Sequence, residues 1–362
     1  MKKQMSLRVK AYRGKDHKMK HILTTGLIAL VSLSAVPAIA CKPAPAHPEY
    51  LLVGNKGDDS ISFINLETGR EISRRAVSAK APHEIAITPS GQFAAVVNYG
   101  SAAIDMFNIA FKTIETTIDL GENLNPHGIV ALKNGGFVAT TEGGNSIVIL
   151  SPNHDLSVSS NGLCPTHDWT VEAIPTGQDG THMIALSPDE NTAFTANLRS
   201  GTISKINLTT KTVKSVPAGK EVEGIAVTKD GKEAWASVRG ENKVIVYDAE
   251  TLSPLTEIPV GAFPLRILVS PDGKHMVTSN LVDGSISVIN VSTKRVERTI
   301  ELSGRRETGQ VTLLFSEDGR RLYAAETGTN KIAEIDFETG ELIGRLSAGS
   351  QGDGLAIVPA IH

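Results

Sequence analysis

Cysteine and aromatic residues are scarce in this sequence of 362 residues. It contains two cysteines and two tryptophans, and Phe, Trp and Tyr together make up 4% of it. The sequence has no C-x-x-C-H motif for covalent haem attachment, and two tryptophans are too few for the Trp-rich docking pattern of quinoprotein dehydrogenases. A P-loop, a dinucleotide-binding fingerprint and a nucleophile elbow are also absent. Motifs therefore give no support to a nucleotide-binding protein or a serine hydrolase.

The sequence also lacks an excess of positive charge once its first forty residues are set aside. Residues 1–40 hold eight of the 36 basic residues and one of the 39 acidic residues. The remainder has 28 basic and 38 acidic residues, a net charge of −10. Nucleic-acid binding depends on basic side chains that neutralise phosphates. We therefore expect no nucleic-acid partner.

Residues 1–40 have the pattern of a signal peptide. Lys20 and His21 precede a short apolar run, which ends in Ala38-Ile39-Ala40. A basic start, an apolar core and an A-x-A site are typical of secretory signals. Residues 1–18 form a long basic extension, so that Met19 is an alternative start. We expect a periplasmic or otherwise exported protein.

The two cysteines allow alternative fates after export. Cys41 follows Ala38-Ile39-Ala40, an atypical lipobox, so a lipid anchor on Cys41 is one prediction. A soluble periplasmic form is the second, and a Cys41–Cys164 disulfide in an oxidising compartment is the third. Residues 41–49 (CKPAPAHPE) are predicted to form a Pro-rich tether.

A pattern of short strands and tight turns recurs along nearly the whole chain. In each copy an apolar strand leads into a turn such as Pro-Asp-Gly, and three further strands follow. The turn position recurs at intervals of 41 to 55 residues. It is held by Gly91, Gly135, Glu190, Gly231, Gly273 and Gly319. Such a period, with several strands per copy, is typical of β-propeller blades, which must stack to bury their faces.

Six complete copies and one divided copy predict seven blades. The complete copies begin at Pro82, Pro126, Thr181, Val222, Pro264 and Gln310. Residues 50–77 supply three strands without a first one, and residues 352–359 supply an isolated first strand. Pairing this C-terminal strand with the N-terminal three removes the free edges of an open array. The sequence therefore predicts an all-β fold, a seven-bladed β-propeller over residues 50–362 that is closed by its C-terminal strand.

The second and third strands of the copies carry a shared signature. Examples are FTANLRSGTISKINL at 194–208 and VTSNLVDGSISVINV at 277–291. These segments resemble the YVTN-repeat β-propeller family, which includes YncE-like bacterial periplasmic proteins. The resemblance covers all seven copies, and the Trp-Asp ends of WD40 blades are missing. It implies a repeat scaffold and does not specify an activity.

One position of the repeat gathers ionisable residues. The second residue of the first strand is, in ring order, Asp353, His83, His127, His182, Glu223, Leu265 and Val311. We call the face on which these strands start the top face. The first strands of a propeller surround its central channel, so five neighbouring ionisable side chains are predicted at the top-face channel mouth.

These residues are candidate metal ligands. Imidazoles of His83, His127 and His182 with carboxylates of Glu223 and Asp353 suit a divalent transition metal such as Zn, Cu or Fe. The alternative is a polar channel mouth in which each histidine binds the next blade or water.

Two classes of function fit this sequence. The first is an exported binding scaffold with a ligand or metal site at the channel mouth. The second is a metal-dependent hydrolase or lyase, similar to a lactonase, with Glu223 or Glu142 as the base. A lesser alternative is an accessory protein of a periplasmic quinoprotein or copper pathway. We expect a monomer that binds an unknown protein or small molecule on the top face and contacts membrane only through a lipid on Cys41.

Overall fold

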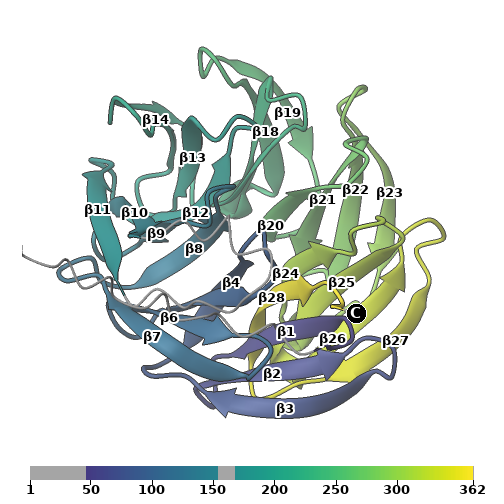
Figure 1. Ribbon diagram of the computed structural model, residues 1–362. Coiled ribbons are helices and arrows are strands. Elements are labelled where there is room, and N and C mark those ends of the chain that lie inside the picture. Colours follow the sequence, from purple (N-terminus) through teal and green to yellow (C-terminus); the bar gives the residue numbers. More distant parts are fainter. Residues whose placement is uncertain (1–45, 154–167, 362) are drawn as a thin grey trace, which may run out of the picture. The chain divides into compact units, whose positions relative to one another are not determined.

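The computed structural model describes residues 46–153 and 168–361, which form a ring of seven blades (Figure 1). Each blade is a four-stranded antiparallel sheet, so the predicted seven-bladed β-propeller is confirmed. The predicted signal peptide over residues 1–40, Cys41 and Cys164 lie outside the described residues. The described part of the chain has no helix that is long and apolar enough to cross a membrane.

The first three blades, from innermost to outermost strand, contain the following elements. Blade 1 consists of β28 (Gly352–Val358), β1 (Tyr50–Asn55), β2 (Ser60–Asn65) and β3 (Arg70–Ala76). Blade 2 consists of β4 (Pro82–Ile87), β5 (Phe93–Asn98), β6 (Ala103–Asn108) and β7 (Thr113–Asp119). Blade 3 consists of β8 (Pro126–Ala131), β9 (Phe137–Thr141), β10 (Ser146–Pro152) and β11 (Trp169–Pro175).

The other four blades repeat this order. Blade 4 consists of β12 (Thr181–Leu186), β13 (Thr192–Asn197), β14 (Thr202–Asn207) and β15 (Val213–Pro217). Blade 5 consists of β16 (Val222–Val227), β17 (Glu233–Val238), β18 (Lys243–Asp248) and β19 (Pro254–Pro259). Blade 6 consists of β20 (Pro264–Val269), β21 (His275–Asn280), β22 (Ser285–Asn290) and β23 (Arg295–Glu301). Blade 7 consists of β24 (Gln310–Phe315), β25 (Arg321–Glu326), β26 (Lys331–Asp336) and β27 (Leu342–Ser347).

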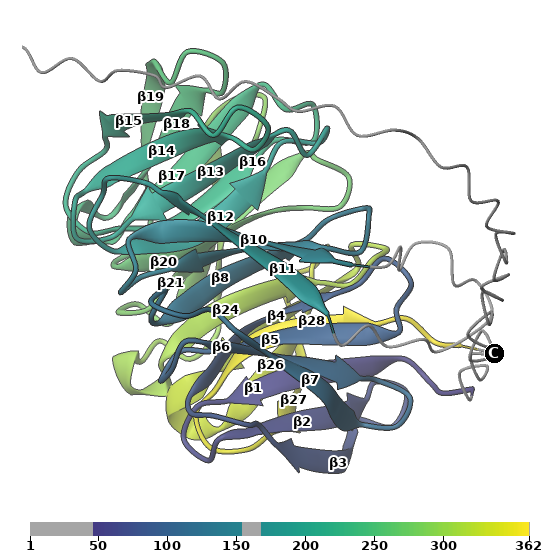
Figure 2. The same cartoon turned by 60° about the vertical axis from the view of Figure 1, so that its left-hand side comes forward.

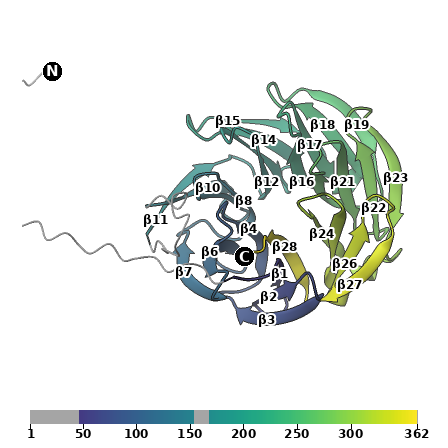
Figure 3. The same ribbon diagram turned by 45° about the vertical axis from the view of Figure 1, so that its right-hand side comes forward.

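The two ends of the chain complete one blade. Strand β28 pairs antiparallel with β1, with Tyr50 opposite Val358, as predicted from the divided copy (Figures 2 and 3). Just before β1, His47 forms an isolated bridge with Ile361, and its ring stacks on that of Tyr50 at 5.0 Å. Since every blade then has both neighbours, no sheet of the described chain presents its face to solvent without a partner.

Apolar side chains fill the interfaces between adjacent blades. Within the described residues the core divides into seven clusters, one for each interface. Between blades 1 and 2, for example, Phe63 and Phe107 are buried completely or nearly so. Burial of one such side chain stabilises the fold by about 1.5–3 kcal/mol. Stacking of blades therefore supplies the cohesion that one four-stranded sheet lacks.

The turn between the first two strands of a blade is fixed by side-chain hydrogen bonds. In blade 6 the hydroxyl of Ser270 donates to Asp272 Oδ1 at 2.6 Å, and Gly273 adopts a φ of 75°. Thr228 and Asp230 make the same contact in blade 5 at 2.7 Å. The left-handed backbone conformation at the end of this turn favours glycine, which explains the repeated Asp-Gly pair.

Candidate functional site

A β-bulge interrupts the start of every innermost strand. In β4, Pro82 pairs with Asn98 but Ile85 pairs with Val96, so one extra residue is inserted after Pro82. The equivalent irregularity occurs in β8, β12, β16, β20, β24 and β28. A bulge bends its strand and turns side chains away from the regular alternation. It therefore brings the second residue of each innermost strand to the mouth of the central channel.

Hydroxyl groups of neighbouring blades fix the backbone at three of these positions. Thr140 donates to the carbonyl of His182 at 2.5 Å, and Ser237 donates to that of Leu265 at 2.7 Å. Ser279 binds the carbonyl of Val311 in the same way at 2.6 Å. In blades 4, 6 and 7 the backbone that carries the channel-mouth side chain is thus held from two blades at once.

All the predicted site residues border one top-face cavity of about 450 Å³. Its ionisable wall contains His83, His127, His182, Glu142, Glu223 and Asp353. Its apolar wall contains Phe263, Leu265, Leu281 and Val311. The volume lies within the range of small-molecule sites, about 300–1,000 Å³. The cavity has one polar and one apolar side, because the second strand residue changes character around the ring.

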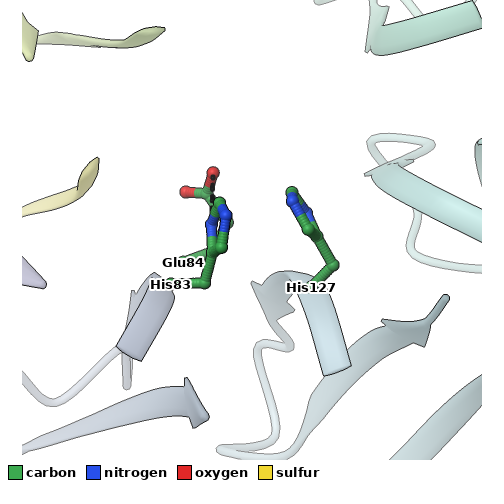
Figure 4. A group of neighbouring side chains, drawn as sticks. All are labelled: His83, Glu84 and His127. Carbon is green, nitrogen blue, oxygen red and sulfur yellow. Dashed lines mark ion pairs between the residues drawn. The ribbon is translucent and has the colours of Figure 1, made fainter. Parts of the chain in front are cut away.

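The three histidine rings follow one another in a column, tilted by 43° between His83 and His127 and by 38° between His127 and His182. The ring centroids of His83 and His127 lie 4.0 Å apart, and those of His127 and His182 lie 3.7 Å apart. Figure 4 shows His83 and Glu84 side by side on β4, with His127 beside them on β8. Tyr99 closes one side, with its ring centroid 5.7 Å from those of both His83 and His127.

His182 is held between two carboxylates. Its Nδ1 lies 3.2 Å from Glu142 Oε2, and its Nε2 lies 3.0 Å from Glu223 Oε1. Both nitrogens must donate a proton to satisfy these contacts, which requires the imidazolium form. Burial alone would lower the pKa of His182, but Glu223 and Glu142 outweigh burial and raise it. His182 is therefore the charged member of the column, and neither of its nitrogens is open to a metal.

The two carboxylates also bind arginines. Glu223 accepts hydrogen bonds from Arg239 at 2.7 Å and Arg266 at 3.0 Å. Glu142 binds Arg199 through Oε1 and through its backbone carbonyl. Burial opposes ionisation of Glu223, but His182 and the arginines lower its pKa to about 2. Burial likewise opposes ionisation of Glu142, yet the contacts with His182 and Arg199 lower its pKa. Both side chains are carboxylates at neutral pH.

His83 is neutral and has one nitrogen available. Its Nε2 lies 3.3 Å from Asp353 Oδ2, while Lys56 Nζ lies 2.5 Å from the same oxygen. Burial lowers the pKa of His83 to about 3. Its Nδ1 is buried without a hydrogen-bond partner and lies 3.9 Å from Glu84 Oε1. The lone pair of Nδ1 is thus free to bind a ligand.

His127 has the least satisfied ring of the column. Within residues 46–153 and 168–361 no hydrogen bond engages either of its nitrogens, and Nδ1 is buried. Burial keeps the pKa of His127 well below its ordinary value, so the ring is neutral. A buried imidazole without partners has lost hydration without compensation. Such a group is a strong candidate for a ligand-binding residue.

Arg266 crosses the channel beneath the column. From β20 its guanidinium donates to Glu84 Oε1 on β4 at 2.8 and 3.2 Å, and to Glu223 on β16 at 3.0 Å. Arg266 and Glu84 are adjacent to the channel-mouth position, within the bulge, so both turn inward. This ion-pair network forms the floor of the top-face cavity.

Sequence reasoning found Glu142, which follows the second strand of blade 3, but missed the equivalent residues of five other blades. Lys56, Tyr99, Leu198, Arg239 and Leu281 all occupy this repeat position, and all border the cavity. Comparing this position around the ring, as was done for the innermost strands, would have found them.

Two overlapping groups of side chains have the spacing of a metal site. The first is His83, Glu84 and His127, and the second is His127, Glu142 and His182. In each group one ligand atom per residue lies within 4.8 Å of the others. Asp353 and Glu223 belong to neither group within the described residues; Asp353 contacts Lys56 and Glu223 contacts Arg239 instead. The predicted five-residue metal set thus stays a prediction, with His127 common to both groups.

The chain is a seven-bladed propeller with a largely polar cavity at its channel mouth. A comparison with protein families identifies a family with such a domain. Residues 14–281 match the family model described as the cytochrome D1 heme domain. The chain therefore belongs to the cytochrome D1 haem domain family. The match does not name YVTN repeats, so that finer resemblance stays a prediction. No curated protein matches the chain.

Solved structures share the fold at low sequence identity. Hydrazine synthase of Kuenenia stuttgartiensis is 16% identical, with a TM-score of 0.67 over 82% of this chain and 94% of that one. Dihydro-heme d1 dehydrogenase NirN in complex with DHE is 14% identical, with a TM-score of 0.57 over 87% and 77%. A putative 6-phosphogluconolactonase of Bacteroides fragilis is 19% identical, with a TM-score of 0.65 over 86% and 98%.

Proposed function

We propose that this chain is an exported binding protein whose top-face cavity holds a metal-bearing macrocycle of the haem d1 type. The observation that supports this proposal is His127, a buried neutral imidazole without a hydrogen-bond partner in the described chain. It borders a cavity of about 450 Å³ in a member of the D1 haem domain family.

The residues of the cavity fit such a group. Histidine nitrogen is a common axial ligand of haem iron, and His127 offers one. The apolar wall with Phe263 and Leu265 suits one face of a macrocycle. When bound, the iron macrocycle supplies redox and ligand-binding chemistry, while the chain's residues bind and orient it.

A titration followed by absorption spectroscopy tests the proposal. The purified chain is titrated with haem d1 and, as a second probe, with iron protoporphyrin. We expect saturable binding with a shift of the main absorption band, weakened at least tenfold in His127→Ala. The matched control is His275→Ala, which removes a half-buried histidine outside this cavity. Absence of binding, or equal loss in both variants, overturns the proposal.

A divalent transition metal alone is the second candidate ligand. It is favoured by the group of His83, Glu84 and His127, where Nδ1 of His83 is buried and unpartnered. Elemental analysis of untagged protein distinguishes the two candidates. A bare metal gives stoichiometric Zn, Cu or Fe without a macrocycle absorption band, and His83→Ala lowers that metal content.

Metal-dependent hydrolysis is disfavoured by the candidate bases. A general base works best when its pKa is near the working pH. The pKa of Glu223 is held at about 2, and that of Glu142 is also lowered, by the cations that bind them. Both side chains are therefore weak bases, and we limit the proposal to binding.

Export is part of the proposal and depends on residues 19–40. Their pattern of a basic start, an apolar run and Ala38-Ile39-Ala40 supports a periplasmic location. A lipid on Cys41 and a Cys41–Cys164 disulfide stay alternative predictions. Intact mass of the protein recovered from the periplasm or membrane distinguishes them, because a lipid adds mass and a disulfide removes two hydrogens.

A further inference from the structure

A second cavity occupies the central channel below Arg266. It has a volume of about 500 Å³, and all seven innermost strands contribute to its wall. The wall is mostly aliphatic, and several side chains are only half-buried although they lie inside the ring. Examples are Val130, Met183, Leu186, Leu268 and Val269. We call this space the lower compartment.

The lower compartment is separated from the site described above by the Arg266 network. Arg266 borders both cavities, whereas its partner Glu84 borders only the lower one. The guanidinium is already bound to Glu84 and Glu223 at 2.8–3.2 Å. It is therefore saturated with carboxylates and does not offer its charge to a further anion.

Lys229 is the other basic residue of the lower compartment. It follows β16, in the turn that leads to β17, and its side chain is exposed. Among the ion pairs of the described residues none involves Lys229, whereas Lys232 of the same turn lies 3.5 Å from Asp230. An apolar compartment with one unpaired cation at its end is complementary to an amphiphile with one negative charge.

We propose that the lower compartment binds a straight-chain carboxylate, with its hydrocarbon chain in the channel and its carboxylate at Lys229. The half-buried aliphatic side chains provide the apolar contact that the hydrocarbon chain needs. The carboxylate stays at the end of the compartment, where water and Lys229 both stabilise its charge. This site is independent of His127 and of any group in the top-face cavity.

Calorimetric titration of the full chain with hexanoate, octanoate and decanoate tests the proposal. Each added methylene buried in an apolar site strengthens binding by up to about fourfold, so affinity rises along the series until the channel is filled. The alcohol of the same length binds more weakly than the carboxylate. In Lys229→Gln this difference disappears, while Lys232→Gln, the matched control, keeps it.

Two further variants distinguish the channel from adventitious apolar surface. Leu186→Trp and Leu268→Trp fill the compartment from different blades, and each is expected to weaken decanoate binding at least tenfold. Circular dichroism shows which of the two variants is folded, and one folded variant is sufficient for the binding test. Absence of decanoate binding to the parent chain, or unchanged binding in a folded Trp variant or in Lys229→Gln, overturns the proposal. Binding of haem in the top-face cavity is unaffected by these variants, so the two proposals fail separately.

Discussion

His182 is the residue on which the charge balance of the channel mouth depends. It is the one histidine of the column whose pKa is raised, and it separates the carboxylates of Glu142 and Glu223. His83 and His127 differ from it because burial without a sufficient partner lowers their pKa. Three equal side chains in equivalent positions thus have different protonation states, which depend on their neighbours.

We predict that His182→Gln destabilises the fold in a pH-dependent way. Loss of the imidazolium between two buried carboxylates costs roughly 3 kcal/mol. Because the folded pKa of His182 lies above the unfolded value of 6.5, its contribution is full below pH 6.5. The contribution decreases as the pH rises through the folded pKa. Urea unfolding at pH 6 and pH 9 should show the larger loss at pH 6.

The control for this variant is His275→Gln. His275 also contacts a carboxylate, Glu297 at 3.1 Å, but near the surface, where such a pair contributes less than about 1 kcal/mol. A loss of stability in His182→Gln that is the same at both pH values would contradict the imidazolium assignment.

At the scale of single strands, β28 is the element that closes the ring and carries part of the site. Gly354 lies in its bulge, against the backbone of β4, and a Cβ there would overlap the carbonyl oxygen of His83. Asp353 beside it binds Thr312 at 2.7 Å and Lys56 at 2.5 Å. Closure of the ring and positioning of His83 thus depend on the same short segment.

We predict that Gly354→Ala is destabilising, by about 2–3 kcal/mol, because β4 or β28 must shift to admit the methyl group. The shift also displaces His83, so the imidazole NMR signals of His83 should change. Gly344→Ala in β27 is the matched control, since a Cβ at Gly344 meets no atom within 4 Å. Equal stability of the two variants would show that β28 is not packed tightly against β4.

The start of each innermost strand could be predicted from the sequence, and the network inside the channel could not. Turn chemistry and apolar runs repeat, so the starts at Pro82, Pro126 and Gln310 agree with those observed. The contact of Arg266 with Glu84 depends on bulges that break the regular alternation of side chains. It also joins residues 182 positions apart across the ring. No local pattern encodes such a contact.

At the scale of the whole molecule, one side chain connects three blades across the channel. Arg266 of blade 6 binds Glu84 of blade 2 and Glu223 of blade 5. Blades of a propeller otherwise contact only their neighbours. The cross-channel contact therefore couples sheets that are not adjacent and separates the top-face cavity from the lower compartment.

A double-mutant cycle measures this coupling. Arg266→Met leaves the buried Glu84 without its cation, and we expect a loss of about 3–5 kcal/mol in unfolding free energy. Glu223 keeps Arg239 and His182, so the main cost comes from Glu84. The double variant Arg266→Met/Glu84→Gln should recover part of this loss, about 2 kcal/mol. Additive effects in urea unfolding would contradict the cross-channel contact.

Because the bulge recurs in all seven innermost strands, substitutions at the channel-mouth positions can change the chemistry of the cavity without changing the fold. At each bulge a side chain enters the channel, and at three of them a hydroxyl of the neighbouring blade holds the backbone, as Thr140 holds the carbonyl of His182. An exchange of histidine for glutamate or leucine there leaves the hydrogen-bond ladders intact. Seven sites of variation surround one cavity, so a new specificity needs only a few substitutions and no new backbone.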